Sequence, residues 1–165
     1  MDMTLEELHT EDRARIVEMA ELAKVIWKEY YEPMLPDGQT DYMIALFLSP
    51  EAIGEQLAEK KRWFFVRYGG EDVGFICFYP IEGAMYLSKF YLRADMRGRG
   101  FGRRIIDVVS EEARKRGLGA IELNVNKYNA TTAIYERLGF VRIRDEKNDI
   151  GQGYYMDDYV YRLKL

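Results

Sequence analysis

A run of glycines and arginines from Arg97 to Arg103 most constrains what this chain can fold into. It follows an aromatic-rich apolar segment that ends at Leu92 and precedes a stretch whose apolar residues recur at helical spacing. Glycine allows close approach of a ligand to the main chain. The free amides of a first helical turn and the helix dipole both favour an anion. The pattern therefore predicts a strand, an anion-binding loop and a helix.

The other elements follow from hydrophobic periodicity and from Gly and Pro positions. We expect a helix from Thr10 to about Tyr30, short helices over 42–48 and 50–60, and a helix after the glycine run that stops at Gly117. A further helix is expected over 130–138, with Asn129 as its N-cap. Strands are expected over 63–68, 73–79, 84–92, 120–125, 140–144 and 154–165. These elements predict a mixed sheet flanked by helices.

Composition narrows the class of protein. A chain of 165 residues is long enough for one domain with its own core, and 48% hydrophobic with 32% charged residues is typical of globular proteins. There is no apolar run long enough to span a membrane, and the net charge of -4 argues against nucleic acid as a partner. A single cysteine excludes an internal disulfide, and the first residues lack a secretory pattern, so we expect a cytoplasmic protein.

Three interpretations of the glycine run compete with one another. A Walker loop would need Gly-Lys-Ser/Thr, which is absent, and a dinucleotide-binding fingerprint would need Gly or Ala where Arg103 stands. The third is a tight turn that only exposes its arginines to solvent. The first two are excluded, and the third remains open on this segment alone.

Two motifs carry a family resemblance. Arg97-x-x-Gly100-x-Gly102 resembles the pyrophosphate loop of the GNAT superfamily of acyl-CoA-dependent N-acetyltransferases. The segment Ile134-Tyr135-Glu136-Arg137-Leu138-Gly139-Phe140 is similar to that family's Tyr-Glu-Lys-Leu-Gly-Phe segment. The resemblance covers residues 62–145 closely and the rest by element order.

The resemblance implies an α/β (α+β) fold in one N-acetyltransferase domain over residues 1–165. Its central mixed, mostly antiparallel sheet would have six to seven strands and about four to five flanking helices. Residues 1–60 would form a helical acceptor side, 62–145 the core with the CoA loop, and 146–165 the closing strand. A V-shaped split between the central parallel strands would hold the cofactor.

The same resemblance implies acetyl-CoA as co-substrate and no metal. The loop amides would bind the CoA pyrophosphate, and the strand before the loop would pair with the pantetheine arm and supply a backbone N–H to the developing oxyanion. The implied cofactor-binding residues are Phe90, Tyr91, Leu92, Arg97, Gly98, Arg99, Gly100, Phe101, Gly102 and Arg103. Asn126 and Asn129 are interchangeable as a further contact, and each is also explained as a helix cap.

Acetyl transfer to an amine needs a proton acceptor, because neutralising a lysine-like amine at pH 7 costs about 4.6 kcal/mol. Glu82 is one candidate base, and Ser88 or a backbone carbonyl acting through ordered water is another. By resemblance, Tyr135 is the general acid that hydrogen-bonds the departing CoA sulfur. The plainer alternative for Tyr135 is a core tyrosine beside Ile134 and Leu138.

The acceptor should be selected by residues outside the motif core. Tyr30, Tyr31 and Asp157 are the expected substrate contacts, since carboxylates among aromatic rings favour a cation. The segment 156–160 is similar to the closing strand of some polyamine-acetylating family members, so a small-molecule amine, a polyamine included, or a peptide amine is the expected partner. A non-catalytic acyl-CoA-binding regulatory domain is the alternative function, and a homodimer would suit the Tyr-rich last strand.

Overall fold

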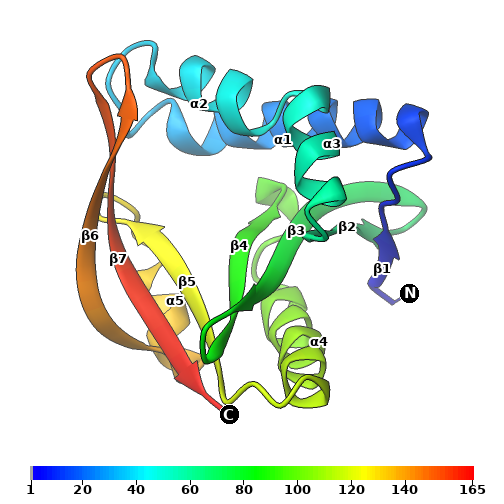
Figure 1. Ribbon diagram of the computed structural model, residues 1–165, viewed down its shortest axis with the longest axis vertical. Coiled ribbons are helices and arrows are strands. Elements are labelled where there is room, and N and C mark those ends of the chain that lie inside the picture. The colour runs from blue at the N-terminus through cyan, green and yellow to red at the C-terminus, as the bar shows by residue number, and fades with distance from the viewer. Residues whose placement is uncertain (1) are drawn as a thin grey trace. The chain divides into compact units, whose positions relative to one another are not determined.

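The computed structural model in Figure 1 describes residues 2–165. Contacts divide the chain into two compact units. The first unit runs to Tyr79 and includes Lys89–Phe101, whereas the second comprises Pro80–Ser88 and Gly102–Leu165. The strand that leads to the glycine loop therefore begins in the second unit and ends in the first.

Within the described residues, seven strands form one sheet in the order β1-β2-β3-β4-β5-β7-β6. Their bounds are β1 Thr4–Glu7, β2 Arg62–Tyr68, β3 Glu71–Ile81, β4 Ala84–Leu92, β5 Ala120–Asn126, β6 Val141–Gly151 and β7 Tyr154–Lys164. Strands β4 and β5 are parallel, while β1 with β2, β2 with β3, β5 with β7 and β6 with β7 are antiparallel. With five α-helices in the described residues, the predicted mixed and mostly antiparallel α/β fold is confirmed.

In the described part of the first unit, three helices lie between β1 and β2 along the chain: α1 (Arg13–Tyr31), α2 (Gln39–Phe47) and α3 (Pro50–Ala58). The carboxylate of Asp12 accepts a hydrogen bond from the amide of Arg15 at 3.1 Å and so caps α1. Ser49 caps α3 in the same way through the amide of Ala52, with Pro50 at the first helical position. All three predicted helices in this region are therefore confirmed (Figure 1).

In the second unit, α4 (Phe101–Lys115) presents the predicted apolar stripe to the core. Ile105, Val109 and Ala113 are buried, and Gly117 follows the helix with a φ of 69°. The parallel pairing of β4 with β5 joins Met85 to Ile121 and Tyr86 to Glu122, near the start of both strands.

Three elements differ from the sequence prediction. The four-residue strand β1 was not expected, and β6 continues to Gly151 instead of stopping near residue 144. Helix α5 covers only Thr132–Arg137, so Asn129 does not occupy its N-cap, which is Thr131.

Candidate functional site

The glycine loop has the backbone that an anion site needs. Gly98 and Gly100 have φ values of 73° and 80°, which non-glycine residues adopt only with strain. A Cβ atom built at either position would meet no heavy atom within 4 Å, so both glycines face open space. The amides of Gly98, Arg99 and Gly100 donate no backbone hydrogen bond within residues 2–165. They lead directly into the first turn of α4, where amides are also without helical partners.

Side chains of the loop hold its shape. Arg97 donates to the carbonyl of Leu92 at 3.3 Å, and Arg99 donates to the carbonyl of Asp95 at 3.3 Å. Phe101 is buried, with its ring centre 5.1 Å from that of Tyr68. Arg103 is exposed on α4. Two arginines of the loop therefore donate hydrogen bonds to main-chain carbonyls. A simple turn with solvated arginines does not require such hydrogen bonds.

The last residues of β4 lie in the first unit and are half-buried. A Cβ at Gly74 of β3 would come within 2.5 Å of the Tyr91 carbonyl oxygen, so only glycine permits this close approach of β3 to β4. The neighbours of Tyr91 on this strand are Phe90 and Leu92.

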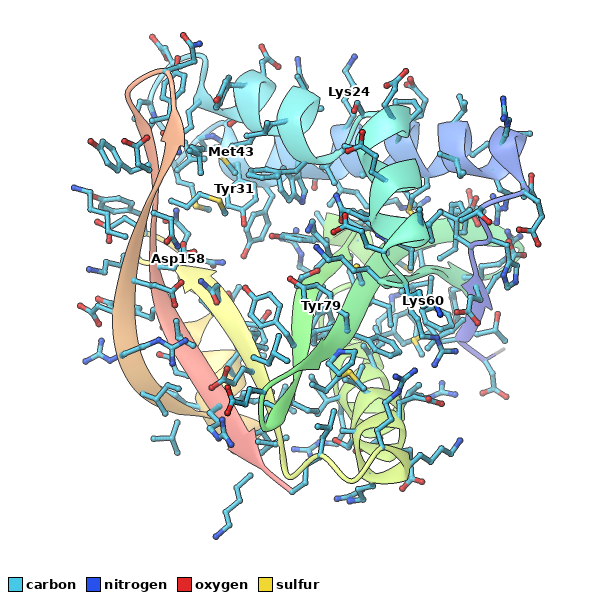
Figure 2. All side chains as sticks on the ribbon, in the orientation of Figure 1. Lys24, Tyr31, Met43, Lys60, Tyr79 and Asp158 are labelled. Carbon is cyan, nitrogen blue, oxygen red and sulfur yellow. The ribbon has the colours of Figure 1, made fainter. Side chains whose placement is uncertain are left out.

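Aromatic side chains gather around Tyr91. The hydroxyl of Tyr31 lies 2.7 Å from that of Tyr91, and the Trp27 ring packs edge-on at 5.5 Å between centres. The Tyr30 ring lies 5.7 Å from Tyr91, with the Arg97 guanidinium 5.3 Å from the centre of the Tyr30 ring. Figure 2 labels Tyr31 on α1 and Met43 on α2. Two expected acceptor contacts and two expected cofactor contacts are thus neighbours in the first unit.

Lys89 was not singled out in the sequence. It lies on β4 directly before Phe90, with its ammonium nitrogen 5.6 Å from the centre of the Trp63 ring. Burial lowers the pKa of Lys89, because the charged form loses hydration. The thiol of Cys77 opposes this shift, whereas the charge of Lys61 adds to it. The position of Lys89 in the alternating strand did not predict this lowered pKa.

Tyr135, the expected general acid, lies on α5 in the second unit and is half-buried. Its ring packs edge-on against Phe140 at 5.8 Å and tilted against Tyr161 at 6.4 Å. These contacts fix the ring on the face of β7 that α5 covers. For the ring, these contacts agree with the alternative interpretation of Tyr135 as a core tyrosine.

Both candidate asparagines serve the turn between β5 and α5. The side-chain oxygen of Asn126 accepts from the amide of Tyr128 at 2.9 Å, and that of Asn129 accepts from the amide of Thr131 at 2.9 Å. Local bonds of this kind stabilise tight turns. Asn126 is buried and Asn129 is half-buried, so the local turn role holds for both.

Two further expected residues have different surroundings. The Asp157 carboxylate forms an ion pair with Lys127 at 3.1 Å, so its charge is already matched by a cation of the chain. Glu82 is exposed in the turn between β3 and β4, where the carbonyl of the next residue, Gly83, accepts from Arg162. Ser88, near the end of the β4 segment in the second unit, is half-buried.

A row of polar side chains crosses β4, β5 and β7 in the second unit. The Tyr86 hydroxyl donates to the Asn124 side-chain oxygen at 2.8 Å, and the Asn124 amide donates to Asp158 Oδ2 at 3.2 Å. Asp158 is only 3% exposed. Burial raises its pKa to about 6, and the charges of Glu146 and Asp157 add to this, while the Asn124 hydrogen bond opposes it. Figure 2 labels Asp158 beside β7.

A separate pocket of about 400 Å³ lies at the opposite end of β7, and none of the expected site residues lines it. Its lining residues are Gly119, Gly139, Val141, Ile143, Arg162 and Lys164. Within residues 2–165, no three His, Cys, Asp or Glu side chains are grouped so as to hold a metal ion. No helix in the same range is long and apolar enough to cross a membrane.

Comparison with known proteins gives consistent results. The family model described as an acetyltransferase (GNAT) domain matches residues 33–154. A relative from Pseudomonas aeruginosa, an L-methionine sulfoximine/L-methionine sulfone acetyltransferase, is 28% identical over 129 residues, which cover 66% of this chain and 74% of that protein.

Solved structures share the fold. The paia N-acetyltransferase of Thermoplasma acidophilum, in complex with coenzyme A, aligns with a TM-score of 0.77 at 19% identity and covers 100% of both chains. The protein yncA of Salmonella typhimurium, with its cofactor acetyl-CoA, aligns with a TM-score of 0.64 at 18% identity, over 100% of this chain and 95% of that one. The family model spans most of the sequence and includes the glycine loop and Tyr135. The chain therefore belongs to the acetyltransferase (GNAT) domain family, and it is an N-acetyltransferase.

Proposed function

We propose that the chain transfers the acetyl group of acetyl-CoA to the amine of a small molecule or peptide, by direct attack in a ternary complex. The observation that carries this proposal is the loop at Gly98 and Gly100. The amides of residues 98–100 donate no backbone hydrogen bond within residues 2–165, and a Cβ at either glycine would meet open space. The loop runs directly into the first turn of α4. The CoA pyrophosphate is the anion that we assign to them.

The reaction makes two demands on the chain. As the amine nitrogen bonds to the carbonyl carbon, the carbonyl oxygen becomes negative, and a main-chain amide of residues 90–92 is the proposed donor to it. When the carbon–sulfur bond breaks, the CoA thiolate needs a hydrogen bond, and Tyr135 is the proposed donor. A phenol of pKa about 10 protonates a thiolate of pKa about 8.5 uphill by about 2 kcal/mol, so the hydrogen bond alone is sufficient.

The proposed acceptor class is a small amine that is cationic in water. Tyr30 and Tyr31 are half-buried or buried aromatic side chains next to Tyr91, and an aromatic wall attracts a cation. The relative from Pseudomonas aeruginosa is named for two amino-acid acceptors, which carry an α-amine. Polyamines are a second acceptor class, because residues 156–160 are similar to the closing strand of some polyamine-acetylating family members.

Thiol release tests this proposal directly. Purified protein with saturating acetyl-CoA is offered methionine sulfoximine, methionine sulfone, spermidine, free amino acids and a lysine peptide in separate assays. Release above the no-amine rate with one class supports the transferase and identifies its acceptor. If acetyl-CoA binds but no amine in the panel stimulates release, the function proposed here is wrong and a regulatory acyl-CoA-binding role replaces it.

A further inference from the structure

Asp158 lies on the side of the sheet that faces away from α5. Side chains alternate along a strand, and Tyr161 of β7 contacts α5 through both Tyr135 and Glu136. Asp158 is three residues from Tyr161 and therefore points to the other face. The cross-strand partner of Asp158 on β5 is Asn126, and Asn124 shares this face with it.

The carboxylate of Asp158 is held at one oxygen. Its Oδ2 accepts from Asn124, whose own oxygen is fixed by the Tyr86 hydroxyl. Within residues 2–165 this is the one hydrogen bond that the Asp158 carboxylate makes. The other carboxylate oxygen, Oδ1, is left to accept a hydrogen bond from a ligand.

Among the described residues, no cationic side chain forms an ion pair with Asp158. Glu146 is its cross-strand partner on β6, and Asp157 precedes it in β7. Lys127, at the end of β5, is the nearby cation that acts on it, but Lys127 pairs with Asp145 at 3.2 Å and Asp157 at 3.1 Å. Glu146 is paired with Arg144 at 3.3 Å. A carboxylate this buried and unmatched destabilises the fold, and such groups are concentrated at functional sites.

We propose that Asp158 is the catalytic base that removes the proton from the attacking amine, with Asn124 and Tyr86 as positioning residues. This inference rests on the proposed function and deepens it. As the carbon–nitrogen bond forms, the proton of the attacking nitrogen passes to Asp158 Oδ1. The carbon–sulfur bond breaks, the thiolate leaves while it accepts a hydrogen bond from Tyr135, and solvent then protonates the thiolate and takes the proton from Asp158. The net products are the amide, CoA thiol and one proton from the ammonium form of the amine.

Asp158 has the proton affinity that this role needs. A base is most effective when its pKa lies near the working pH, and the pKa of Asp158 is raised to about 6. It is therefore ionised at neutral pH, yet it holds a proton more readily than an exposed aspartate does. Glu82, the base considered from the sequence, is exposed in a turn.

The test is a pH profile of kcat/KM for the best amine of the panel, with Asp158→Asn compared with Asp107→Asn, a substitution on the exposed side of α4. We expect wild-type activity to rise through a limb near pH 6. Asp158→Asn should lower kcat by roughly 100-fold or more and abolish that limb, with acetyl-CoA affinity unchanged. Asp107→Asn should behave as wild type.

A second variant keeps the test decisive if Asp158→Asn folds poorly. The Asn124 hydrogen bond lowers the pKa of Asp158, so Asn124→Ala should move the limb to higher pH. An unmoved limb in Asn124→Ala, or an Asp158→Asn variant within threefold of wild-type kcat, overturns the assignment while leaving the transferase intact. Absence of turnover in the wild type with every amine would instead remove the proposed function and this inference with it.

Discussion

The hydroxyl oxygens of Tyr31, on α1, and Tyr91, on β4, lie 2.7 Å apart in the first unit. Tyr31 is 7% exposed, so this hydrogen bond is largely shielded from water. We expect Tyr31→Phe to lower the free energy of unfolding by about 1 kcal/mol, since a neutral buried hydrogen bond contributes roughly that amount. Denaturant unfolding measures the change. In a double-mutant cycle with Tyr91→Phe, strictly additive losses would show that the two hydroxyls do not interact.

Stability should depend on pH through Asp158. Its pKa is about 6 in the folded protein against an ordinary 3.8, so the folded state holds the proton more tightly than the unfolded chain. The preferential binding of this proton therefore contributes stability that is fully present below pH 3.8. The contribution is lost as pH rises through about 6. We expect Asp158→Asn to be more stable than wild type at pH 7.5, by up to about 3 kcal/mol at 1.36 kcal/mol per pKa unit.

The pH dependence of the stabilisation by Asp158→Asn serves as its control. The gain from Asp158→Asn should shrink as pH falls and be absent near pH 4, whereas Asp107→Asn should show little difference at either pH. Thermal unfolding at the two pH values measures both variants. A destabilised Asp158→Asn at pH 7.5 would contradict the view that this carboxylate is buried without a cation.

Tyr135 distinguishes chemistry from packing. Tyr135→Phe keeps the ring contacts with Phe140 and Tyr161 and removes only the hydroxyl. We expect kcat to fall by about tenfold to 100-fold, with little change in the dissociation constant of acetyl-CoA, because the lost hydrogen bond acts on the departing thiolate. Steady-state thiol release and calorimetry measure the two constants. Unchanged kcat would limit Tyr135 to the packing role.

The parts of the fold that the sequence predicted are those with a local physical cause. The amphipathic stripe of α4 ends at Gly117, whose positive φ stops the helix. The turn at Gly69 and Gly70, with φ values of 63° and 79°, joins β2 to β3 as expected. The loop at Gly98 and Gly100 was identified because glycine in these conformations is a backbone requirement.

The missed parts depend on contacts remote in sequence. Strand β1 has four residues and exists through its pairing with β2. The second half of β6 is charged and exposed, so it has no alternation to detect, and β7 supplies its hydrogen-bonding partner. The start of α5 was placed too early because Asn129 bonds the Thr131 amide in a turn. The burial of Asp158 could not be predicted, because only the neighbouring strands bury it.

A matched pair of glycine variants tests whether the glycine loop binds acetyl-CoA. Gly100 and Gly70 have φ values of 80° and 79°, and a Cβ at either would meet no heavy atom within 4 Å. Substitution by Asp should therefore cost both the same backbone strain, about 1–2 kcal/mol. Only Gly100→Asp places a negative charge beside the proposed pyrophosphate site.

Calorimetric titration of acetyl-CoA into wild type, Gly70→Asp and Gly100→Asp is the most direct measurement. We expect similar affinity for wild type and Gly70→Asp, and at least a 100-fold weaker affinity for Gly100→Asp. Equal affinity in all three proteins, or no binding to the wild type, would contradict this expectation.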